Sequence, residues 1–313
     1  MTISTVKKRF VSRSVFRNNL LGLMFAAPWV IGFLGLWLYP MLSSLFYSFT
    51  EFNVFMPPEW VGISNYIELF QDDVFYKSIG NTLYMTVYFI PIAIILSLLM
   101  ALLLNANVKG QGIFRTLFYI PSVLPLVATS MLWMWMFNYE YGLLNFLIRF
   151  LGVKSPPTWL EDPVWTKPAL MFMGIWGIGN TVILFLASLQ EVPRIYYEAA
   201  TIDGANALQR FFRITLPSIS NIILYQVIIA IIGMLQYFTQ AYVLLQKHLV
   251  SAAGGPENSM LFYCLNLYYN AFIYFKMGKA SAMAWLLFLV TVVITVLIFK
   301  SSAKWVYYGG DEN

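Results

Sequence analysis

The sequence predicts an all-α integral membrane protein with six transmembrane helices. Of its 313 residues, 60% are hydrophobic and only 11% are charged, whereas an ordinary soluble domain is about one quarter Asp, Glu, Lys and Arg. A water-soluble globule is therefore excluded. A helix needs about 20 apolar residues to cross the hydrocarbon core of a bilayer, and six runs reach that length. They are residues 20–49, 78–105, 116–138, 168–190, 220–244 and 280–299.

The six runs contain no Asp, Glu, Lys, Arg or His, as expected when burying a charge in lipid costs several kcal/mol. The first run follows five basic residues, but its length, its internal Pro28 and Pro40 and the lack of a small-residue cleavage site indicate a retained helix, not a signal peptide. Interior prolines favour kinks because each removes a backbone hydrogen bond. For Pro121 and Pro125 in the third run, a gating hinge and simple packing both stay open.

Basic residues predict the orientation, because cytoplasmic loops of membrane proteins are enriched in Lys and Arg. Most of the 19 basic residues precede the first run, follow the sixth, or lie in the second-to-third and fourth-to-fifth connections, and most of the 14 acidic residues lie in the other connections. We expect a multi-pass protein of the inner (cytoplasmic) cell membrane with both termini in the cytoplasm. Its parts are a cytoplasmic segment at 1–19, a transmembrane domain at 20–300 and a cytoplasmic tail at 301–313. The net charge of +5 is then an orientation signal, and no nucleic-acid partner is expected.

The residue inventory excludes several kinds of site. Cys264 is the only cysteine and His248 the only histidine, which excludes an internal disulfide and a zinc site of the usual kind. A P-loop needs Gly-x-x-x-x-Gly-Lys-Ser/Thr, and the nearest candidate, Gly278-Lys279, has Ile273 and Ala280 at the first and last positions. We therefore expect no catalytic residue, metal site or cofactor in this chain.

Two function classes compete with a transport subunit driven by another polypeptide. A secondary transporter driven by protons or sodium would more often carry an intramembrane carboxylate or basic group. A membrane-embedded enzyme would need paired carboxylates, histidines or metal ligands near the membrane surface. The charge-free runs disfavour the first class, and the single histidine, His248, in an outer connection without an obvious partner disfavours the second.

The fourth-to-fifth connection, residues 191–217, has a distinctive pattern. Pro193 suits the first turn of a helix, apolar residues follow at helical spacing, and Gly204 is a natural stop before a second short helix at about 205–213. Small alanines would let another protein approach closely, and Glu198 and Asp203 would supply acceptors. An amphipathic loop on lipid headgroups is the alternative that these residues leave open.

Two motifs carry a resemblance to a known family. Glu198-Ala199-Ala200, Gly204, Ile214 and Leu216-Pro217 resemble, at matching spacing, the EAA signature of permease subunits of binding-protein-dependent ABC importers. The segment before the last run is similar to the carbohydrate branch of that family, on the maltose and glycerol-phosphate permease side. Its matching residues are Gly254-Gly255-Pro256, Tyr268, Ala271-Phe272, Tyr274-Phe275 and Met277-Gly278-Lys279-Ala280-Ser281-Ala282.

The resemblance implies a type I ABC importer permease fold whose 191–217 loop couples to a separate ATPase. It also implies the partners: a second homologous permease, two cytoplasmic ATPase subunits that hold ATP and Mg, an extracytoplasmic solute-binding protein, and the lipid bilayer. The substrate is expected to be a sugar, in particular an oligosaccharide, imported by alternating access; the sequence does not name it. The implied ATPase contacts are Glu198, Ala199, Ala200, Asp203 and Gly204.

Candidate substrate contacts follow from helical spacing in the fourth and fifth runs. Met173, Trp176, Gly177 and Asn180 share one helical face, and Gly233, Gln236, Tyr237 and Gln240 share another. Aromatic rings cover apolar sugar faces, and amides and phenols bond hydroxyls; interhelical packing is the alternative. Residues Trp133, Trp135 and Asn138 of the third run fit an interfacial role instead. The predicted pathway residues are Trp176, Asn180, Gln236, Tyr237 and Gln240.

Overall fold

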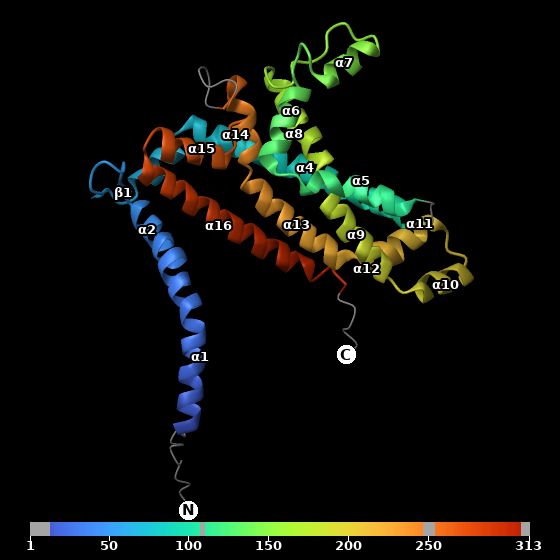
Figure 1. Cartoon of the computed structure of the whole chain (residues 1–313), viewed down its shortest axis with the longest axis horizontal. Helices are drawn as coiled ribbons and strands as arrows, with labels where there is room; N and C mark the ends of the chain where they lie inside the picture. Colours follow the sequence, from blue (N-terminus) through green and yellow to red (C-terminus); the bar gives the residue numbers. More distant parts are fainter. Residues whose placement is uncertain (1–12, 107–109, 247–253, 308–313) are drawn as a thin grey trace, which may run out of the picture.

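The computed structural model describes residues 13–106, 110–246 and 254–307, and these are almost entirely helical (Figure 1). The predicted class, all-α, is confirmed. A short antiparallel hairpin of β1 (Thr50–Glu51) and β2 (Glu59–Trp60) pairs Thr50 with Trp60. His248, residues 1–12 of the predicted segment 1–19 and residues 308–313 of the predicted tail lie outside the described residues. Helix α1 already begins at Arg13.

Four helices of the described chain are long and apolar enough to cross a membrane. The first combines α1 (Arg13–Gly32), η1 (Phe33–Leu38) and α2 (Tyr39–Tyr47). The others are α4 (Asp73–Asn105), α13 (Ser220–Leu235) with α14 (Thr239–Leu245), and α16 (Met277–Ser302). Two further helix pairs pass the same test together, so the described chain has up to six spans if each bent pair is counted as one.

The third and fourth runs are not continuous helices, which corrects the sequence-based expectation. The third is split into α5 (Gln111–Val123) and α6 (Leu126–Met136), bent by 98°, and the fourth into α8 (Pro163–Trp176) and α9 (Gly179–Glu191), bent by 48°. Pro125 explains the sharper bend, because a residue before proline avoids the helical region, and Leu124 is indeed extended with ψ 140°.

Charged residues occur in the end turns of several helices, outside the six charge-free runs. Helix α4 begins at Asp73, capped by the Asp72 carboxylate, which accepts from the Val74 amide. Helix α16 begins at Met277 and includes Lys279, and α8 includes Lys167. The helices thus extend beyond the apolar runs, and charged residues at their ends cap the helix, as Asp72 does, or pair with other side chains, as Lys279 does.

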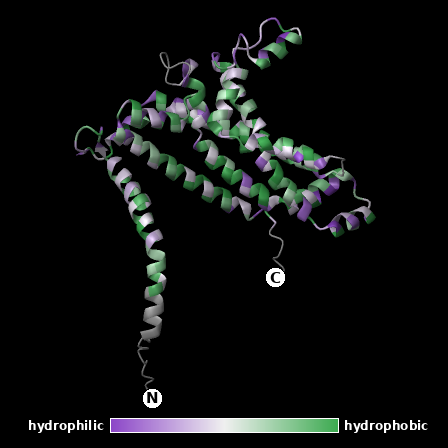
Figure 2. Ribbon diagram, viewed as in Figure 1, coloured by the Kyte–Doolittle hydropathy of each residue, from purple (hydrophilic) through white to green (hydrophobic). Residues whose placement is uncertain are grey.

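The body of the protein is built around α4, which packs against α9 and α13. Apolar side chains such as Leu98, Phe185 and Ile219 fill one half of this core, and Met85 and Leu265 belong to the other half. Figure 2 shows hydrophobic residues along the long helices. The remaining helices are α3 (Ser64–Phe70), α7 (Leu143–Phe150), α10 (Arg194–Ile202), α11 (Ala207–Arg210), η2 (Phe211–Thr215), α12 (Leu216–Ser218), η4 (Pro256–Asn258), α15 (Tyr263–Tyr268) and η5 (Tyr269–Ile273).

The first span stands apart from this body. Helix α1 projects away from the other helices in Figure 1, and within Leu21–Tyr47 none of the most apolar stretch is buried against the rest of the described chain. Side chains as large as Phe25 and Trp29 are 87% and 72% exposed.

Candidate functional site

A cavity of about 440 Å³ lies among α4, α8, α13 and the turn between α5 and α6. This volume falls within the range of about 300–1,000 Å³ that small-molecule sites occupy. Non-helical backbone at membrane depth is tolerated where it lines a cavity. Three helix breaks border this one: the turn that contains Leu124, the Gly177 junction between α8 and α9, and the residues 236–238 between α13 and α14.

The cavity is lined by neutral groups. None of its described lining residues is an Asp, Glu, Lys, Arg or His, so it offers no counter-charge to an ion. Hydroxyls and amides are present beside apolar side chains, and they can bond the hydroxyls of a neutral solute. The polar lining residues are Ser122, Thr129, Gln236, Tyr237, Thr239 and Gln240.

Thr129 is a lining residue that sequence reasoning missed. Its Oγ1 is buried and has no hydrogen-bond partner among the described residues, whereas the neighbouring Ser130 hydroxyl donates to the Leu126 carbonyl. A buried hydroxyl without a partner costs free energy, which a ligand in the cavity would recover. The signal available in the sequence was Pro125, whose break turns the start of α6 towards the cavity.

The five predicted pathway residues divide into two groups. Gln236, Tyr237 and Gln240 all line the cavity, although the helix that carries them is interrupted. Trp176 and Asn180 do not line it. Because the fourth run bends at the end of α8, these two residues do not share the face that spacing predicted. The Trp176 ring packs edge-on against the Trp133 ring, with 5.9 Å between the ring centroids, and Asn180 is exposed on α9.

Close helix packing fixes the wall opposite α13. A Cβ on Gly179, the first residue of α9, would collide with the carbonyl oxygen of Phe118 in α5. On α8, a Cβ on Gly174 would lie 2.6 Å from the Phe89 ring. Only glycine allows these helices to approach so closely, so both positions help to set the shape of the cavity.

The 191–217 segment forms the predicted helix, glycine turn and helix. Helix α10 ends at Ile202, Gly204 adopts a left-handed φ of +77°, and a capping box between Asn206 and Gln209 starts α11. The second helix continues as η2, as far as Thr215. Tyr197 ties the two arms together, because its hydroxyl lies 2.9 Å from the Thr215 hydroxyl.

This segment presents an apolar surface that nothing in the described chain covers. Ile195, Ile202, Leu208 and Phe212 are 65%, 87%, 68% and 56% exposed. Exposed apolar patches rimmed by polar residues mark interaction sites. Of the five predicted ATPase contacts, Glu198, Ala199, Asp203 and Gly204 are exposed and Ala200 is half-buried.

Comparison with known proteins identifies the family. Residues 93–306 match the family described as "Binding-protein-dependent transport system inner membrane component". The chain belongs to this family. The probable ABC transporter permease protein YesP of Bacillus subtilis (strain 168) is 38% identical over 96% of both chains. The arabinooligosaccharides transport system permease protein AraP of the same organism is 33% identical over 90% of this chain and 88% of its own.

A solved structure shows the same fold. It is a chain of the bacterial alginate ABC transporter in complex with an alginate pentasaccharide-bound periplasmic protein. The TM-score is 0.76 at 23% sequence identity, and the match covers 95% of this chain and 98% of the other. The predicted permease fold and family are therefore confirmed. This permease is a membrane-spanning, non-catalytic component of a binding-protein-dependent ABC transport system.

Proposed function

We propose that this permease imports a neutral sugar, in particular an oligosaccharide, through the charge-free cavity. The observation that carries the proposal is the cavity itself, in which three interrupted helices bring hydroxyls and amides together without any ionised lining group. The names of relatives support the oligosaccharide part of the proposal: AraP belongs to an arabinooligosaccharides transport system, and the periplasmic protein of the structural neighbour holds an alginate pentasaccharide. Alginate is acidic, so the neutral charge that we assign to the substrate follows from the cavity lining alone.

Within the cavity we assign the polar contacts to α13–α14 and α6. Gln236 and Gln240 offer amides, Tyr237 offers a ring and a hydroxyl, and Thr129 offers its free hydroxyl. An amide both donates and accepts, which suits sugar hydroxyls that do the same. Trp176 and Asn180, which sequence spacing predicts as pathway residues, do not line the cavity, so we assign them no contact in it.

Coupling to an ATPase is assigned to α10, Gly204 and α11. The two short helices expose apolar side chains and small alanines, so a groove on another protein can receive them, and Glu198 offers a carboxylate to a basic group there. ATP and Mg belong to that ATPase, two copies of which would lie at the cytoplasmic side. Both termini of this permease are then cytoplasmic, with the hairpin β1–β2 outside.

A second, homologous permease would complete the pathway. The first span supports this partner, because only its α2 end packs against α16, whereas large apolar side chains of α1 such as Phe25 and Trp29 are exposed. An extracytoplasmic solute-binding protein would deliver the sugar. Alternating access then opens the cavity outward when ATP draws the ATPases together and inward after hydrolysis.

The coupling assignment is tested by charge reversal in the reconstituted complex. E198K should lower ATP-dependent uptake at least about tenfold, because it replaces an attraction to a basic group with a repulsion at a protein interface. The matched control is E191K, the same reversal at an exposed residue at the end of α9. We expect E191K to transport within about twofold of the wild type. Equal uptake by the two variants would contradict the assignment.

A further inference from the structure

A second recess, of about 370 Å³, lies at the end of the molecule opposite α10 and α11. It is enclosed by the β1–β2 hairpin, α3 and the segment that leads into α16. The Asn65 amide donates to the carbonyls of Ser48 and Thr50, and the Gly278 amide donates to the Phe52 carbonyl at 3.2 Å. The hairpin is thus fixed against the first turn of α16. At the other end of α16, the chain that follows it contacts the start of α13, where the Tyr307 amide donates to the Ser220 hydroxyl.

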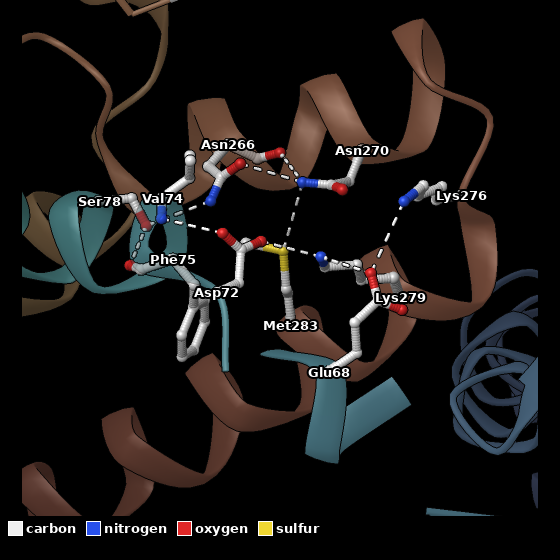
Figure 3. Close-up of polar contacts among 10 residues, drawn as sticks. All are labelled: Glu68, Asp72, Val74, Phe75, Ser78, Asn266, Asn270, Lys276, Lys279 and Met283. Carbon is white, nitrogen blue, oxygen red and sulfur yellow. Dashed lines mark hydrogen bonds and ion pairs between the residues drawn. The ribbon is translucent and has the colours of Figure 1, made fainter. Parts of the chain in front are cut away.

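A buried lysine and two carboxylates form an ion cluster at the base of this recess (Figure 3). The Lys279 ammonium, only 7% exposed, donates to Glu68 Oε1 and Asp72 Oδ2, each at 2.9 Å. The hydrogen bond from Lys279 holds the pKa of Glu68 below its ordinary value, with burial opposing it. Glu68 therefore stays anionic at neutral pH and shares the Lys279 ammonium with Asp72.

The charges that face outward do not balance. Glu68 is 52% exposed, and its second cation, Lys276, is 57% exposed and lies at 3.6 Å. Glu51 also lines the recess and is exposed. Three carboxylates, those of Glu51, Glu68 and Asp72, therefore stand against the two ammonium groups of Lys276 and Lys279. The cluster has one excess negative charge, which makes the recess complementary to a cation.

An apolar rim stands beside the recess. The rings of Phe55 and Phe275 lie 5.1 Å apart and are 74% and 43% exposed. Val54 and Met56, on the same hairpin turn, are also exposed. Val54 and Phe275 both adopt left-handed φ angles, 70° and 53°, which side chains of this size rarely accept. Exposed aromatic residues beside a charged hollow are typical of protein interfaces.

We propose that this recess and its rim are the docking point for the solute-binding protein, which inserts a Lys or Arg side chain between Glu51 and Glu68 and packs an apolar side chain on Phe55 and Phe275. The inference rests on the proposed function, which places this face outside the cell. A protein cation fits better than a lipid surface, because the phosphates of lipid headgroups would be repelled by the negative recess.

The test measures docking of the fluorescent cognate binding protein to the complete transporter in nanodiscs. E51K places a cation in the recess and should raise the Kd about tenfold at low salt, with a smaller effect at high salt. F275A should also raise it, independently of salt. The control is E59K, because Glu59 faces Glu51 across the hairpin and is exposed but does not line the recess. Its Kd should stay within about twofold of the wild type.

The possible outcomes distinguish failure of the docking proposal from failure of the proposed import function. If both E51K and F275A bind the solute-binding protein with the wild-type Kd, the docking proposal is wrong. This result is expected of a patch that only touches lipid. An equal loss in E51K and E59K also overturns the docking proposal, because the effect would then be general electrostatics. If the wild-type complex itself fails to bind the protein, both the docking site and the proposed function are wrong. Basal ATPase activity without binding protein should be the same in every variant, which excludes misassembly.

Discussion

The Lys279 ion cluster permits a sharp prediction about stability. The double variant E68Q/D72N removes both counter-charges but leaves the ammonium 7% exposed, and leaving a buried charge unpaired costs about 3–5 kcal/mol. Asparagine caps helices as well as aspartate does, so the Asp72 cap on α4 is not the cause of this loss. In K279M the carboxylates remain, and since Glu68 is 52% exposed it stays hydrated. We expect a smaller cost there, about 1–3 kcal/mol.

The triple variant K279M/E68Q/D72N makes the argument testable. It leaves no charge in the cluster and fills the space of the lysine stem with an apolar side chain, which is often close to neutral in stability. Hydrogen exchange of the hairpin and α3 amides in nanodiscs gives the local opening free energy. The expected order is wild type, then K279M and the triple variant, then the double variant. A triple variant no more stable than the double one would refute the reasoning.

The other predictions concern pH, packing and the cavity. The pKa of Glu68 is depressed, so its contribution to stability is full above the ordinary value of 4.5 and is lost as the pH falls through the lower folded value. Hairpin exchange should therefore accelerate below about pH 4.5 in the wild type and much less in K279M. G179A should destabilise by about 1–3 kcal/mol and lower the thermal unfolding midpoint, because its Cβ collides with the Phe118 carbonyl; an unchanged midpoint would mean that α5 and α9 are not in close contact. Q236A and T129V should raise the KM of uptake several-fold while the complex still assembles, whereas N180A should leave it near the wild-type value. The reverse pattern would favour the face predicted from spacing over the cavity.

Much of the architecture was accessible from the sequence because it depends on local patterns. Apolar length locates the six runs, and Gly204 correctly separates two short helices, since its φ of +77° is one that glycine adopts without steric cost. Spacing also predicted a shared face for Gln236, Tyr237 and Gln240, and all three line the cavity although the helix is interrupted between α13 and α14.

The rest depends on contacts between distant segments. Pro125 predicts a kink, but the angle of 98° between α5 and α6, which brings Thr129 to the cavity, depends on how α5 packs against α9. Asn180 was placed by assuming a straight fourth helix, and the 48° bend removes that basis. From the sequence, Lys279 is one of several lysines on the outer side, and nothing indicates an ion pair. Its partners Glu68 and Asp72 lie 211 and 207 positions away along the chain. No periodicity connects residues so far apart.

Uptake of labelled oligosaccharide into proteoliposomes is the most direct test of the central claim. The vesicles would hold this permease, its partner permease and the ATPases, with ATP inside and the binding protein outside. We expect uptake only when ATP, the ATPases and the binding protein are all present, with loss of uptake in E198K. Uptake by this chain alone under a proton or sodium gradient would contradict the account.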